Sequence, residues 1–277
     1  MRQVGSRRIA FRLLGGLFPT LLLACVAQAQ DLVPGTTLAH GAGAIRQAWF
    51  AAPTTRYPHG ALGDPVEAGA LVLRNPAGAD YRLTLPEERV FEDLVPRLVT
   101  AGGLGDAAMV IESDRDQGAR LSFYGLRQEQ VVLLAATPFI GRSNRWLALV
   151  GIGDFDGDGR AEEVALVAMP HLAGLLRVYR LQAGTLPLLA EAAGYSNHVY
   201  GRAEIAMSAV MKAAGRDLIL VPDRGRRRLL RLSLRDGRLA EEEGAAQVLP
   251  APLRRLRPEG AGFTAELDDG RVIPVPP

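Results

Sequence analysis

Residues 153–167 read GDFDGDGRAEEVALV, and this stretch decides the fold. Oxygen-bearing side chains stand at positions 1, 3, 5 and 9 of a short loop that starts at Asp154, and glycines stand where the backbone must turn sharply. The apolar run 164–167 follows at once and predicts a strand. Alternate carboxylates on a curling backbone can supply most of the roughly six to eight oxygens that calcium binds.

Two other interpretations compete with a calcium loop of this kind. The EF-hand loop also begins with alternate aspartates, but it requires a glutamate at about position 12 and a helix on each side. Position 12 here is Ala165, inside the apolar run, whereas the acid Glu162 stands at position 9. The EF-hand is therefore excluded. A solvated acidic turn without metal stays open, although five carboxylates within ten residues would repel one another.

The spacing D-x-D-x-D-G-x-x-E before a strand resembles the FG-GAP or VCBS repeat, the calcium-loop repeat of integrin-like β-propellers. The resemblance implies that Ca²⁺ is bound by the side chains of Asp154, Asp156, Asp158 and Glu162 and by the carbonyl of Arg160. More loosely, the whole chain resembles short single-domain VCBS propellers exported by proteobacteria. That wider resemblance implies no defined activity.

The rest of the chain reads as short strands between Gly, Pro and Asp turns, which is typical of an all-β protein. Five apolar runs recur 37 to 57 residues apart, and each is followed by a second run. A propeller blade of four strands takes about 40 to 50 residues. We therefore predict one β-propeller domain of about five blades over residues 31–277, with six or seven blades if 44–50 and 135–139 start further ones. The first runs are 70–73, 107–111, 164–167, 218–221 and 263–267, and the second runs are 81–85, 121–124, 176–179, 229–232 and 272–275.

Residues 1–29 have the composition of an export signal, with four arginines, an apolar core over 13–26 and a small-x-small cleavage site at 27–29. The core is too short to serve as a transmembrane span in the mature protein. Residues 22–25 also fit a bacterial lipobox, so a lipid anchor at Cys25 is the alternative. Cys25 is the only cysteine, and the mature domain therefore has no disulfide.

The charge of the mature chain argues against nucleic acid as a partner. Without residues 1–29 the chain keeps 28 basic and 30 acidic residues. Arginines nevertheless cluster between 224 and 238, where leucines at 230, 232 and 234 alternate with polar residues. This alternation predicts an edge strand with charged, solvent-facing side chains. The alternative is a docking patch for an acidic partner, an anionic lipid or a polysaccharide.

No spacing of histidines, serines or carboxylates matches a catalytic motif, so no catalytic residue is predicted. Residues 138–146 combine aromatic and arginine side chains, which favour binding. In a propeller this segment could line one pocket with 170–171 and 196–198, and packing is the alternative. His171, His198, Arg142 and Arg145 are the candidates for chemistry there.

These features favour a periplasmic or secreted module that binds calcium and acts without catalysis, as a binding or scaffolding protein at the bacterial cell envelope. We expect a monomer whose partner is an envelope protein or polysaccharide. The alternative function is an envelope enzyme, a polysaccharide hydrolase or lyase with its site at the channel mouth. A fold does not by itself decide between these.

Overall fold

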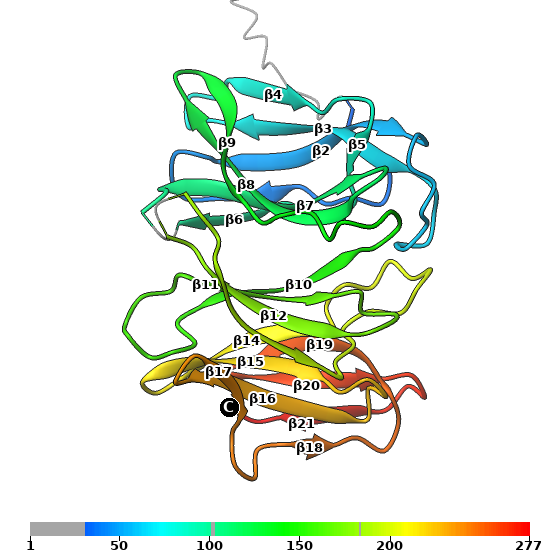
Figure 1. Cartoon of the computed structure of the whole chain (residues 1–277), viewed down its shortest axis with the longest axis vertical. Helices are drawn as coiled ribbons and strands as arrows, with labels where there is room; N and C mark the ends of the chain where they lie inside the picture. The colour runs from blue at the N-terminus through cyan, green and yellow to red at the C-terminus, as the bar shows by residue number, and fades with distance from the viewer. Residues whose placement is uncertain (1–30, 101–102, 183) are drawn as a thin grey trace, which may run out of the picture. The chain divides into compact units, whose positions relative to one another are not determined.

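The chain folds into antiparallel strands, which Figure 1 colours from blue to red along the sequence. The computed structural model describes residues 31–100, 103–182 and 184–277. These ranges contain no helix, and so none that is long and apolar enough to cross a membrane. The all-β prediction is confirmed. The predicted signal peptide and the lipidation of Cys25 lie outside the described residues.

Most strands belong to five successive antiparallel meanders, in which sequence neighbours pair. Two short strands, β5 (Arg89–Phe91) and β18 (Gln247–Val248), make additional pairings. The first meander is β1 (Ala39–His40), β2 (Gln47–Thr54), β3 (Glu67–Arg74) and β4 (Asp80–Thr84); the second is β6 (Arg97–Thr100), β7 (Asp106–Asp114), β8 (Gly118–Arg127) and β9 (Gln130–Ala136); the third is β10 (Leu147–Gly153), β11 (Glu163–Ala168), β12 (Leu175–Arg180) and β13 (Leu188–Ala193); the fourth is β14 (Ala209–Ala213), β15 (Arg216–Pro222), β16 (Arg228–Arg235) and β17 (Arg238–Glu241); the fifth is β19 (Leu253–Glu259), β20 (Gly262–Leu267) and β21 (Val272–Val275).

The paired apolar runs of the sequence are neighbouring strands of these meanders. They fall on β3–β4, β7–β8, β11–β12, β15–β16 and β20–β21, and each pair is antiparallel. The runs 44–50 and 135–139 overlap β2 and β9, which pair within the first and second meanders. They therefore add strands to meanders already counted and start no further ones.

The central part of β11 is a continuous apolar run because both faces of the strand are buried. In β11, Val164 and Leu166 pack in a cluster with strands of the second meander, whereas Ala165 and Val167 pack in a cluster with the fourth. All four side chains are fully buried. Burial on both faces stabilises each strand, at about 25 cal/mol per Å² of apolar surface, and it replaces the usual alternation with a continuous run.

The hydrophobic clusters connect meanders that follow one another in the chain. Strand β5 also pairs with both β3 and β7, which joins the first two meanders into one nine-stranded sheet. Among the residues that the structure describes, no cluster connects the fifth meander with the first, and no closed propeller is seen.

The predicted edge strand at 230–235 is wrong. Strand β16 lies between β15 and β17 and pairs with both. Its alternation arises because leucines fill the core on one face while Ser233 is buried on the other, where it donates to Glu242 at 2.6 Å. Arg231 is half-buried and donates to the carbonyls of Ala245 and Pro276, both at 2.6 Å. Its guanidinium therefore binds backbone of this chain.

Candidate functional site

The acidic loop between β10 and β11 is organised by its own carboxylates. Asp154 accepts hydrogen bonds from the amide N–H groups of Gly157 (2.8 Å) and Gly159 (3.0 Å), and Asp156 accepts from that of Asp158 (3.0 Å). Such side-chain turns explain why aspartate alternates with small residues here. Gly157 has φ of 80°, and a Cβ on it would lie 2.9 Å from the carbonyl oxygen of Gly215. A larger residue is therefore excluded at this position.

Three carboxylates converge beside this loop. Asp154, Asp156 and Glu163 each offer an oxygen, and the three oxygens lie within 4.8 Å of one another. Glu163 is fully buried as the first residue of β11, and its Oε2 accepts the N–H of Phe155 at 2.9 Å. Burial raises the pKa of Glu163, and the nearby charge of Asp156 adds to the rise. This triad could hold a metal ion, and its all-oxygen donors suit a hard cation.

A cation of the chain itself already contacts this triad. Arg180, the last residue of β12, lies opposite Glu163 in the strand pairing and donates to its carboxylate at 2.9 and 3.1 Å. The same guanidinium donates to Asp156 and lies 3.6 Å from Glu162. A bound metal ion would therefore share these carboxylates with Arg180 or displace it.

The predicted ligands divide into two groups in the structure. Asp154 and Asp156 belong to the triad, whereas Asp158, Glu162 and the Arg160 carbonyl do not. The Arg160 guanidinium pairs with Asp158 at 2.8 Å and with Glu162 at 3.5 Å, and the Arg160 carbonyl accepts the N–H of Glu162 at 2.9 Å. The five-residue ligand set stays a prediction. Glu163 was missed, and the available signal was a charged residue opening a strand whose other residues are apolar.

The loop also connects the third meander with the fourth. Phe155 is fully buried in the cluster shared by these meanders, and its carbonyl accepts the N–H of Leu234 at 2.9 Å. Asp154 and Asp217 exchange two hydrogen bonds, of 2.6 and 2.9 Å, that involve their backbones and the Asp217 carboxylate. An ion held by the triad would therefore stabilise the contact between the third and fourth meanders.

A second cluster combines aromatic rings and imidazoles from segments that the sequence placed together. The Trp146 ring centre lies 4.7 Å from that of His198 and 6.2 Å from that of His171, to which it is nearly parallel. The segments therefore meet, and the burial of Trp146 and His198 matches the packing alternative. Within the described residues, neither Arg142 nor Arg145 hydrogen-bonds to these imidazoles through its side chain; Arg142 is exposed and Arg145 is half-buried.

The hydrogen bonds of this cluster assign the tautomers of two histidines. His198 Nε2 lies 2.7 Å from the carbonyl oxygen of Arg202, so Nε2 carries the proton and donates. His198 Nδ1 must then accept, at 2.7 Å, from a protonated Nε2 of His171. Burial lowers the pKa of both histidines to about 4, so both are neutral at physiological pH. With His198 only 2% exposed, this pair supports the loop at Arg202.

A third histidine faces a buried carboxylate that sequence reasoning missed. His59 Nδ1 lies 2.6 Å from Glu92, whose other oxygen accepts the Ser113 hydroxyl at 2.6 Å. Tyr200 donates to the His59 carbonyl at 2.5 Å and its ring lies edge-on to that of His171, which connects the two histidine groups. A carboxylate that orients an imidazole is an arrangement that general bases use. No local motif could reveal it, because these residues are far apart in sequence.

Comparisons with known proteins give no family for the chain. No family model matches it, and no curated protein matches it. Among solved structures, the crystal structure of the Saccharomyces cerevisiae Sqt1 is similar with a TM-score of 0.46 and 13% identity, over 76% of this chain and 55% of that one. The chain thus spans about half the length of that protein. Similarity at this level carries no argument about function.

Proposed function

We propose that the protein is an exported, calcium-binding β-propeller that acts without catalysis, as a binding or scaffolding module at the bacterial cell envelope. The observation that carries this proposal is the position of the triad Asp154, Asp156 and Glu163 at the contact between two meanders. An ion there would hold the third and fourth meanders together, and it would lie beside Phe155, which already packs between them. The five meanders are the proposed blades.

Calcium is the proposed ion because every donor of the triad is a carboxylate oxygen. The resemblance to FG-GAP and VCBS repeats supports the same ion. Asp154, Asp156 and Glu163 would hold it, and Asp158, Glu162 and the Arg160 carbonyl could complete the shell only if Arg160 and Arg180 release their partners. Bound calcium would neutralise charge that now depends on two arginines.

Thermal unfolding in calcium, magnesium and EGTA tests the ion. A ligand that binds only the folded state adds about 2.7 kcal/mol of stability at a hundredfold excess over Kd. Asp156→Asn should lose most of this gain, because it removes a charge yet keeps an oxygen to accept the Asp158 N–H. Asp236→Asn, at an exposed turn outside the site, is the control and should keep the gain. A parent protein equally stable in calcium and EGTA would refute calcium binding.

Affinity capture from native cell envelopes tests the binding role. Tagged full-length protein in calcium should retain a stoichiometric protein or polysaccharide partner, and EGTA should weaken that retention if calcium supports the binding fold. The Asp156→Asn protein in calcium serves, beside the parent in EGTA, as a second sample without bound calcium. Envelopes that yield no stoichiometric partner in either buffer would contradict the scaffolding role.

One observation favours the alternative of an envelope hydrolase or lyase, namely the contact of the partly exposed His59 with the buried carboxylate of Glu92. An oriented imidazole can accept a proton from a substrate hydroxyl or carbon. Turnover of envelope polysaccharides by the parent protein, abolished in His59→Gln and kept in His40→Gln, would establish this alternative. His40 is the matched control because its side chain is exposed.

A further inference from the structure

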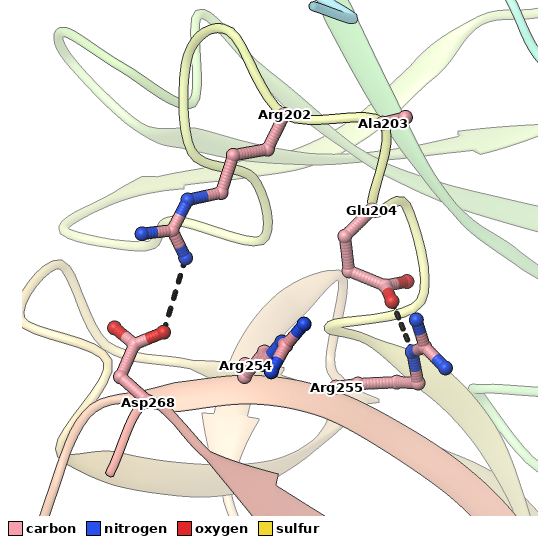
Figure 2. Close-up of a pocket in the computed structure, with 6 residues that line it drawn as sticks. All are labelled: Arg202, Ala203, Glu204, Arg254, Arg255 and Asp268. Atoms are coloured by element: carbon pink, nitrogen blue, oxygen red, sulfur yellow. Dashed lines mark hydrogen bonds and ion pairs between the residues drawn. The ribbon is translucent and has the colours of Figure 1, made fainter. Parts of the chain in front are cut away.

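An open polar cleft of about 600 Å³ lies between the loop after β13 on one side and strand β19 with the turn after β20 on the other. Figure 2 shows its walls, with the Arg202 and Glu204 side chains reaching from the loop toward the strands. Ala203 is the only lining residue without a polar side chain. The lining residues are Arg202, Ala203, Glu204, Arg254, Arg255 and Asp268.

A β-bulge places two successive arginines on this cleft. Leu253 pairs with Leu267 and Arg255 pairs with Glu266, so Arg254 is an extra residue on β19 without a partner on β20. In a regular strand, neighbours 254 and 255 would point to opposite faces of the sheet. A bulge re-aims side chains locally, and here both Arg254 and Arg255 line the same cavity.

The two acids of the cleft are already held by neighbours. One oxygen of Glu204 accepts the N–H of Ala206 at 2.7 Å, and the other accepts the Nε–H of Arg255. Asp268 is shared by Arg202 at 3.1 Å and by Arg226 at 3.0 Å. Each carboxylate is therefore neutralised within the wall, and Asp268 has two cations for one negative charge.

Arg254 is the arginine of the cleft that takes part in none of these ion pairs. In the described part of the chain, no carboxylate lies within ion-pair distance of its guanidinium, which is exposed to the cleft. Figure 2 shows it lying between the Arg202–Asp268 pair and the Arg255–Glu204 pair. A guanidinium has five N–H donors in a planar fork, so Arg202 and Arg255 also keep donors beyond those used on the acids.

We propose that this cleft binds an oxyanion group, a phosphate or a carboxylate, carried by the ligand of the protein. Arg254 would be its principal contact, and Arg202 and Arg255 would add donors from either side. Arginine forks match such planar or tetrahedral oxygens in pairs. The polar lining gives a sugar ring or an apolar group no surface to stack on. This inference deepens the proposed binding role, on which its biological setting depends.

Hydrogen bonds from His198 and from β19 hold the loop that carries Arg202 in place. His198 Nε2 donates to the Arg202 carbonyl, and His198 is itself bonded to His171. The Leu256 N–H donates to the Ala206 carbonyl at 2.7 Å, which ties the other end of the loop to β19. The two walls are thus connected by backbone bonds, so an anion would meet a preformed site.

Calorimetric titration of the purified protein tests the proposal at constant low chloride. The probes are inorganic phosphate and galacturonate, with neutral galactose for comparison, each in calcium and in EGTA. We expect saturable binding of at least one anion at one site, weakened about tenfold in Arg254→Ala and partly restored in Arg254→Lys. Arg238→Ala removes another exposed arginine with the same charge change and should bind like the parent.

The arms of the experiment separate the possible results. Tighter binding of phosphate or of galacturonate identifies the preferred oxyanion, and either supports the site. Absence of saturable anion binding to the folded parent, equal binding of galactose, or equal weakening in Arg238→Ala overturns it. Anion binding that persists in EGTA stands even if the calcium proposal fails. Calcium stabilisation without anion binding would overturn this inference alone.

Discussion

Glu163 and Arg180 face each other across β11 and β12 at the end of the strand pairing. The buried carboxylate depends on this guanidinium for charge compensation, while one quarter of the Arg180 side chain is exposed to solvent. Removing one partner of a buried pair leaves the other charge unpaired, which costs more than the pair contributes. The same guanidinium would oppose any metal ion at the triad.

Arg180→Gln should therefore separate the two roles of this residue. In EGTA we expect a loss of about 2 kcal/mol in unfolding free energy, because Glu163 loses its cation. In calcium the variant should recover more stability than the parent gains, because the competing charge is gone. Chemical denaturation in both buffers measures this. Arg177→Gln, which breaks a pair on the same strand whose carboxylate, on Glu191, is partly exposed, is the control. A smaller calcium gain than in the parent would contradict competition.

Glu67 shows the opposite arrangement: its carboxyl is buried, and no cation of residues 31–100, 103–182 or 184–277 forms an ion pair with it. Burial raises its pKa to about 10, with a further contribution from Glu92, and one of its oxygens has no hydrogen-bond partner. The folded state thus holds a proton that the unfolded state releases near pH 4.5. Stability from this proton is complete below pH 4.5 and is lost progressively as the pH rises toward 10.

Glu67→Gln should consequently be more stable than the parent at pH 9, by about 1 kcal/mol or more, because glutamine resembles the protonated acid. The two proteins should converge near pH 4.5. Denaturation curves at several pH values measure the difference, with exposed Glu87→Gln as the control. A difference that does not change between pH 5 and 9 would show that Glu67 does not carry this proton.

At the scale of the element, the acidic loop acts as a wedge through Phe155, which is fully buried between the third and fourth meanders. Phe155→Ala should lower the unfolding free energy by about 4 kcal/mol, with or without calcium, because it leaves a large cavity. Phe139→Ala should cost less, since that ring is half-buried under two arginines. Equal losses in the two variants, measured by denaturation, would contradict the wedge.

The strands that were clearest in the sequence, such as β3, β7 and β11, have both faces buried, because burial on both faces gives a continuous apolar run such as 164–167. Strands at the sheet margins were harder. β13 mixes exposed and buried residues, and the two-residue β18 is too short for any period. The loop could be predicted because local turns build it. Glu163 and Arg180 could not be paired, since their contact depends on the register of two strands.

At the scale of the whole molecule, ionisable groups inside the protein restrict the pH of greatest stability. Burial lowers the pKa of His171 and His198 to about 4, from 6.5. Stability from their neutral forms is complete above pH 6.5 and is lost as the pH falls toward 4. Glu67 acts in the other direction, so its loss of stability with rising pH partly offsets the gain from the histidines below pH 6.5 and continues alone above it.

Unfolding free energy should fall by about 2 kcal/mol between pH 7 and pH 5 through this histidine pair. His171→Gln keeps a donor for His198 and should flatten that slope, at some cost in stability at pH 7. Exposed His40→Gln should leave the slope unchanged. Urea denaturation across this range measures it, and a slope in His171→Gln equal to that of the parent would contradict the assignment of neutral, buried imidazoles.

The three-residue strand β5 has a consequence for how the molecule opens. By pairing with β3 on one side and β7 on the other, it makes the first two meanders a single hydrogen-bonded unit, whereas the third, fourth and fifth are separate sheets. Native-state amide exchange should therefore show the amides of β2, β3, β7 and β8 exchanging together in one cooperative opening, slower than those of the fifth meander. A protease should accordingly release C-terminal fragments first and leave the nine-stranded sheet as the resistant remnant.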